Sequence, residues 1–178
     1  MAVNNHTDAV ALLKADHRKV EELFETFEST RSEAKKQKLV EQICLELVIH
    51  TMIEEEIFYP ACSGEIEEDT LEEAYVEHDG AKVLIAELQD SKPDAAFYDA
   101  KVKVLSEMIK HHVKEEEQRS EGMFAQAKEA GLDMADLGAR MAARKKALLT
   151  EFKSKGLPHP KTRTYTGNQI EHGAPVSV

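Results

Sequence analysis

Apolar residues recur at steps of three and four along four segments of the chain, and polar residues fill most positions between them. Steps of three and four keep side chains on one face of a helix, because an α-helix has 3.6 residues per turn. The pattern therefore predicts four amphipathic helices that each bury one face. The inward stripes are Leu13, His17, Val20, Phe24 and Phe27; Ile43, Leu47, His50, Glu54 and Ile57; Leu71, Ala74, His78, Ala81, Ile85 and Leu88; and Val102, Leu105, Ile109, His112 and Glu116.

Local signals place the ends of these helices. Thr7 or Asp8 can cap the first helix and Ser32 the second, because short polar side chains bond to free amide groups there. The run 70–73, Thr-Leu-Glu-Glu, fits a capping box that opens the third helix. Pro93 suits the first turn of the fourth helix.

Short connections between helices of about 20 residues favour an all-α, antiparallel up-down-up-down four-helix bundle. Pro60 ends the second helix, and Gly131 ends the fourth or a short continuation of it. We expect this bundle to span residues 1–131. In such a bundle the histidine of each stripe lies at a similar depth, which predicts one common site.

The segment after the bundle predicts one more helix and a polar tail. Asp133 can cap a helix over 132–155, which we expect to cover the bundle; a lid or a homodimer surface is the alternative. The polar residues 156–178 are expected to lack stable structure. We interpret His6, His159 and His172 as surface histidines. The apolar stripe of this helix is Met134, Leu137, Met141, Leu148 and Phe152.

Four histidines and two glutamates occupy positions where a bundle otherwise needs leucine. A single histidine in such a stripe is usually a core residue satisfied by one hydrogen bond. Burying an ionised carboxylate without a partner costs several kcal/mol, yet the four stripes hold no lysine or arginine. Bound metal cations are the simplest source of the missing positive charge. The predicted ligands are His17, His50, Glu54, His78, His112 and Glu116.

Two of the ligand pairs have the same spacing. His50 with Glu54, and His112 with Glu116, each lie one helical turn apart on one face. If both glutamates bridge two metals and each metal takes two histidines, coordination positions stay open for other ligands. Imidazole with carboxylate suits iron, and also zinc, manganese or cobalt.

Several neighbouring residues are alternatives for this site. His111 with Glu115 has the same spacing as His112 with Glu116, but lies one residue out of phase with the stripe. Glu21 follows His17 by one turn and could add a carboxylate, and Tyr75 could donate a hydrogen bond. Glu55 and Glu56 are most simply rim residues, although either could accept a hydrogen bond from a ligand histidine.

Composition narrows the class of protein. The 178 residues carry a net charge of −11, with Lys and Arg scattered, which argues against nucleic acid as a partner. No apolar run approaches the ~20 residues of a membrane span, and 1–7 lacks the features of a signal peptide. Cys44 and Cys62 are too few for a disulfide framework, so we expect free thiols and a cytoplasmic location.

These residues resemble the hemerythrin-like HHE cation-binding domain over about Asp8 to Lys128. The resemblance rests on four runs and implies a four-helix bundle around two iron ions, joined by an oxygen bridge and bound by the six ligands named above. Two departures from the family pattern stand out. Ala74 stands where oxygen-carrying hemerythrins have a histidine, and residues 118–122 follow the glutamates of the fourth run where the family has an apolar residue and a proline. The four runs are 13–17, Leu-Lys-Ala-Asp-His; 50–60, from His50 through Phe58-Tyr59-Pro60; 77–78, Glu-His; and 111–116, His-His-Val-Lys-Glu-Glu.

Three functions use the same ligands. The leading hypothesis is a non-haem di-iron protein that binds or senses dioxygen or a related small molecule. The second is a di-iron enzyme that decomposes hydrogen peroxide, in the manner of a catalase, or handles nitric oxide. The third is storage or structural binding of iron or zinc, in which metal stabilises the fold and no small-molecule chemistry occurs.

Overall fold

The structure, a computed structural model, describes residues 8–167, 171, 173–174 and 176. The described residues form helices and no strand, as the all-α prediction requires. The elements in chain order are α1 Ala9–Ser29, α2 Glu33–Ile53, η1 Glu54–Phe58, α3 Tyr59–Cys62, α4 Glu68–Gln89, α5 Tyr98–Glu117, α6 Met123–Glu129 and α7 Met134–Lys155.

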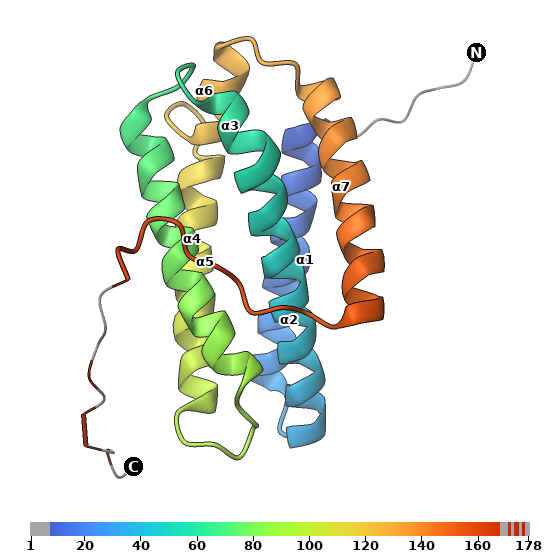
Figure 1. Ribbon diagram of the computed structural model, residues 1–178, viewed down its shortest axis with the longest axis vertical. Coiled ribbons are helices and arrows are strands. Elements are labelled where there is room, and N and C mark those ends of the chain that lie inside the picture. Colours follow the sequence, from blue (N-terminus) through green and yellow to red (C-terminus); the bar gives the residue numbers. More distant parts are fainter. Residues whose placement is uncertain (1–7, 168–170, 172, 175, 177–178) are drawn as a thin grey trace.

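Four long helices enclose the core. α1 contacts α2 and α5, and α4 contacts the same two helices, so the four surround one interior (Figure 1). The inward stripes predicted from the sequence are buried in α1, α4 and α5. Burial of these side chains, each worth about 1.5–3 kcal/mol when large and apolar, therefore holds the helices around the polar centre.

A π-helical turn interrupts the regular spacing after α2. In η1 the amide of Tyr59 donates to the carbonyl of Glu54, five residues back, and so Tyr59 lies above Glu54. The helical run continues past the turn through α3. The predicted stripe is wrong at Ile57, which is half-buried, because the wider turn brings Phe58 and Tyr59 into the core instead. Such turns often occur at functional sites.

Two predicted helix starts are corrected, and a third start is right but lacks the predicted capping bond. α4 begins at Glu68, so Thr70 lies inside the helix, where its hydroxyl accepts from the Gln126 amide instead of capping. α5 begins at Tyr98 and not near Pro93, because Phe97 takes a left-handed φ of 65° that keeps the preceding loop out of the helix. Ser32 is in the capping position of α2 but makes no capping hydrogen bond.

The predicted caps of the first and the last helix are confirmed. The Asp8 side chain accepts from the amide of Ala11, and Asp133 accepts from two amides in the first turn of α7. The alternative cap, Thr7, lies outside the described residues, as do His6 and His172. Capping bonds of this kind stabilise a helix by about 1 kcal/mol.

A tight turn joins α5 to α6. A Cβ atom on Gly122 would lie 2.6–2.7 Å from backbone atoms of Gln118 and Glu115, so only glycine fits there. The turn reverses the chain and brings Phe124 back onto the core, where it is buried. Gly131 follows α6 with a φ of +80°, the conformation that suits glycine at a helix end.

The C-terminal part of the chain covers two faces of the bundle. α7 contacts α1, α2 and η1, and the segment after it crosses the bundle over α2 and α4 (Figure 1). Residues 156–167 form no helix or strand. Arg163 and Thr164 nevertheless bond to the Asp79 carboxylate in α4, contacts that the expectation of an unstructured tail does not include.

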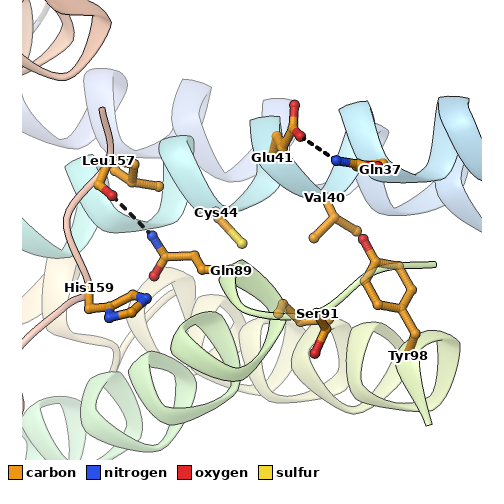
Figure 2. A pocket seen from close by; sticks show the side chains of 10 residues that line it. Gln37, Val40, Glu41, Cys44, Gln89, Ser91, Tyr98, Leu157 and His159 are labelled. Atoms are coloured by element: carbon orange, nitrogen blue, oxygen red, sulfur yellow. Dashed lines mark hydrogen bonds between the residues drawn. The ribbon is translucent and has the colours of Figure 1, made fainter. Parts of the chain in front are cut away.

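A cavity of about 290 Å³ lies where this segment meets α2 and α4, and Figure 2 shows the Gln89 amide reaching the Leu157 carbonyl at its edge. Cys44 lines it, but burial, with a smaller effect of the Glu41 charge, raises the pKa of this thiol to about 12. None of the six predicted ligands lines this cavity. His159, at its rim, is exposed and pairs with Asp90, as expected of a surface histidine.

None of the helices within the described residues is long and apolar enough to cross a membrane.

Candidate metal centre

The four histidines meet in two pairs inside the bundle. Nε2 of His17 lies 3.2 Å from Nε2 of His50, and Nε2 of His78 lies 3.2 Å from Nε2 of His112. Each of the four residues is buried, with at most 5% of its surface exposed. The histidines of α1 and α2 therefore face each other, as do those of α4 and α5. In each pair the two Nε2 atoms meet.

The two glutamates lie between the histidine pairs. Glu54 Oε2 is 3.1 Å from Nε2 of His50 and 3.2 Å from Nε2 of His78, so it faces one histidine of each pair. Glu116 divides its oxygens: Oε2 is 3.3 Å from Nε2 of His17, and Oε1 is 3.5 Å from Nε2 of His112. Both carboxylates therefore occupy bridging positions.

The six predicted ligands thus form two overlapping groups that could each hold a cation. One contains His17, His50, Glu54 and Glu116, and the other contains Glu54, His78 and His112. Within each group the donor atoms lie within 4.8 Å of one another. The structure brings all six residues together; that they bind a metal stays a prediction.

A carboxylate stands behind each histidine. Nδ1 lies 2.8 Å from Glu117 in His17, 3.0 Å from Glu55 in His78, 2.7 Å from Glu77 in His112 and 3.6 Å from Asp16 in His50. A carboxylate beside Nδ1 favours the proton there and leaves the lone pair of Nε2 pointing inward. This is the arrangement that orients histidines for metal binding.

Basic side chains from the C-terminal segments hold two of these outer carboxylates. Lys145 of α7 pairs with Asp16, and Arg163 of the tail pairs with Glu55. Lys82, buried in α4, also donates to Glu55 at 2.6 Å. Positive charge therefore lies beside Asp16 and Glu55, whereas among the described residues no lysine or arginine pairs with Glu54 or Glu116.

The protein alone holds opposite charges at the centre. Burial lowers the pKa of His50, but the charges of Glu54 and Asp16 outweigh it and raise the pKa to about 10. Burial also lowers the pKa of His112, but the charge of Glu116 outweighs it and the pKa rises to about 9. Burial raises the pKa of Glu54, yet His50 and His78 hold it well below its usual value. A cation that binds here must displace protons from imidazoles.

The residues present fit a bound cation. Both oxygens of Glu54 and Oε2 of Glu116 are buried without a hydrogen-bond partner, which is costly unless another group satisfies them. The two close contacts between Nε2 atoms are equally unfavourable when both atoms carry lone pairs. A cation between the nitrogens and oxygens relieves both features, and the nitrogen and oxygen donors suit iron, zinc or manganese.

Aromatic side chains close the centre. The Tyr59 hydroxyl donates to Glu116 Oε1 at 3.0 Å and lies 3.1 Å from Nε2 of His78. Phe124 stacks on the His17 ring with centroids 5.9 Å apart. The sequence pattern missed Tyr59 because the regular period placed Ile57 inward, and the signal for it lay only in the run from His50 to Pro60. Tyr75 contacts Tyr59 edge-on, and among the described residues its hydroxyl makes no hydrogen bond to a predicted ligand.

The other residues that the sequence offered as alternatives belong to neither of the two inner ligand groups. Glu21 pairs with Arg18 on the surface. Glu55 is buried and accepts from a ligand histidine, whereas Glu56 is exposed and pairs with Arg144. His111 is exposed and lies beside Glu77 and Glu115.

The fold and this site define an all-helical cation-binding domain. The sequence matches the model of the hemerythrin HHE cation-binding domain over residues 8–124. The chain belongs to the hemerythrin HHE cation-binding domain family.

Two relatives extend the comparison. The crystal structure of a hemerythrin HHE cation-binding domain-containing protein from Mycobacterium kansasii superposes with a TM-score of 0.71 at 24% identity, over 84% of this chain and 94% of that chain. It shares the fold. A DNA nickase from Nostoc sp. is 29% identical over 106 residues, which are 60% of this chain but 30% of the nickase. The chain therefore spans less than a third of that relative's length.

Proposed function

We propose that this chain is a non-haem di-iron protein that binds or senses dioxygen or a related small molecule. The observation that carries the proposal is the pair of overlapping ligand groups, joined by Glu54 and Glu116. Each group offers two imidazoles; Glu54 belongs to both groups, and Glu116 faces one histidine of each. The proposal includes the antiparallel up-down-up-down order of α1, α2, α4 and α5.

Two iron ions held by these residues would supply a redox-active centre with coordination positions open to a small ligand. The chain's own residues prepare the place. The outer carboxylates at Nδ1 of His17, His78 and His112 favour the tautomer whose Nε2 faces the centre, and the carboxylates of Glu54 and Glu116 would offset the charge of bound cations. Phe124 and Tyr59 wall the centre and limit water. Ala74 leaves one ligand fewer than in oxygen-carrying hemerythrins.

A second function, decomposition of hydrogen peroxide or reaction with nitric oxide, is favoured by Tyr59. Its hydroxyl is fully buried and contacts a ligand histidine and a bridging glutamate. Burial, and then the charge of Glu116, raise its pKa well above the usual value, so the hydroxyl keeps its proton at neutral pH. That proton is donated to Glu116 Oε1, and a small molecule bound beside Glu116 could accept it in exchange for this bond.

Metal analysis with optical spectroscopy tests the proposal. Protein purified from iron-replete cells should hold about two iron ions per chain, and azide, oxygen or peroxide should change its spectrum. His112→Ala should lower the iron content and abolish the spectral response, and the exposed His159→Ala is the matched control. Zinc instead of iron, or iron without any response, would support storage or structural binding. Absence of metal would contradict the metal centre itself.

The proposal names small molecules and not macromolecules as partners. A net charge of −11 disfavours binding to the negatively charged backbone of nucleic acid, so the activity in the name of the nickase is not part of the proposal. A cytoplasmic location and free thiols accompany the proposal. A homodimer through α7 is an outcome that sedimentation would detect.

A further inference from the structure

The six ligands are almost completely buried, so a cation needs a route to reach them. A cavity of about 240 Å³ between α4, α5 and α6 reaches two of them, His112 and Glu116. Glu116 is 1% exposed and its Oε2 has no hydrogen-bond partner. The cavity therefore leads from the surface to two of the predicted ligands, one of which carries an unsatisfied oxygen.

The lining of this cavity is strongly acidic. It contains no lysine or arginine. Ala74 also lines it, so a small side chain stands where a histidine would take up part of the space. A concave, single-sign lining concentrates counter-ions and speeds their association. The glutamates that line the cavity are Glu67, Glu73, Glu77, Glu115, Glu116 and Glu121.

A third group of ligand atoms lies beside this cavity. Nε2 of His111 is 3.3 Å from Glu77 Oε1 and 3.1 Å from Glu115 Oε1. The three donor atoms lie within 4.8 Å of one another, and the group is more exposed than the two inner groups. The pair His111 and Glu115, out of phase with the core, thus has the same spacing as an inner ligand pair but faces outward.

Glu77 connects the outer group to the inner centre. Its Oε2 lies 2.7 Å from Nδ1 of the ligand His112, while its Oε1 faces His111. One carboxylate therefore contacts both groups. An ion held by the outer group is next to the side chain that orients an inner ligand.

We propose that Glu77, His111 and Glu115 form an outer site for a divalent first-row metal cation at the mouth of the acidic cavity, through which the inner centre is loaded. Imidazole with two carboxylates suits such cations. The site is partly exposed and has three protein ligands, so its affinity for the cation should be low. Low affinity lets the cation pass on to the inner centre. This inference rests on the proposed metal centre, but concerns the path to it.

Loading with Co²⁺ tests the path. In the variant His111→Gln with Glu115→Gln, the rate at which the inner cobalt spectrum develops in stopped flow should fall on the order of tenfold at low salt. The final spectrum and inner stoichiometry should equal those of the unaltered chain. The matched control is Glu107→Gln, an exposed change on the same helix with the same change in formal charge, which should load at the original rate.

Equilibrium dialysis supplies a second measurement. The unaltered chain should bind one weak Co²⁺ beyond the inner ions, and the double variant should lose this ion alone. If the double variant loads at the same rate as the unaltered chain and still binds the weak Co²⁺, the proposal of an outer site is overturned, while the proposed metal centre is unaffected. A chain that binds no Co²⁺ at all would instead contradict the proposed function, so the two failures are distinguishable.

Discussion

Replacing the buried Lys82 with methionine should cost the protein much of its stability. The Lys82 side chain is 4% exposed and donates to Glu55 at 2.6 Å and to Asp79 at 3.0 Å. Those carboxylates are 4% and 0% exposed. Lys82→Met leaves both charges buried, and removing one partner of a buried pair costs about 3–5 kcal/mol.

The remaining partners set the size of the effect. Arg163 still pairs with Glu55, and the backbone of Arg163 and Thr164 still donates to Asp79. We therefore expect the lower end, about 3 kcal/mol. In a chain of this length that corresponds to a fall in Tm of about 6–12 °C.

Urea unfolding of the metal-free protein, followed by circular dichroism, measures this loss. The control is Lys155→Met, whose exposed pair with Glu151 should contribute no more than about 0.5 kcal/mol. Adding Asp79→Asn to Lys82→Met should cost less than the sum of the two single changes, because it removes one uncompensated charge. A loss below about 1 kcal/mol for Lys82→Met, at an unchanged denaturant slope, would refute the buried-charge reasoning.

Three further outcomes follow. Protonated His50 and His112 stabilise the metal-free fold, fully so below pH 6.5, and the Tm of the metal-free protein should therefore fall as pH rises through about 9 and 10. The iron-loaded protein should instead gain stability as pH rises, because protons leave the ligands. Gly122→Ala should lose about 1–3 kcal/mol in urea unfolding, because its Cβ would meet backbone atoms at 2.6–2.7 Å. Cys44 and Cys62, buried with pKa values of about 12, should resist iodoacetamide at pH 8 until urea unfolds the chain.

The periodic pattern predicted the all-helical class and most of the inward residues, because both depend on which side of a helix a residue occupies. His17 and Phe24 are seven residues apart and both are buried, as two turns of a helix require. The choice of His112 over His111 followed from phase alone, and the structure has His112 buried and His111 exposed. Where the period is regular, one sequence suffices.

The same reasoning failed where the period changes. The π-turn after Glu54 adds a residue, and no step of three or four brings both Glu54 and Tyr59 to one face. The helix ends show a related limit. Thr70 carries a capping pattern, yet α4 begins two residues earlier and the Thr70 hydroxyl bonds to Gln126 of α6, a tertiary contact that no local pattern contains.

The outer carboxylates show why part of the candidate metal centre escapes sequence reasoning. A ligand must face the core, so its helical phase identifies it, but a residue that orients a ligand can come from any element that passes nearby. Asp16 precedes His17 yet stands behind His50, and its own partner, Lys145, comes from α7. Arg163 lies beyond the family match at 8–124 and still holds the carboxylate behind His78. Lys145 and Arg163 therefore tie Asp16 and Glu55 to the C-terminal segments of this chain, and the domain alone would lack both partners and keep only Lys82 beside Glu55.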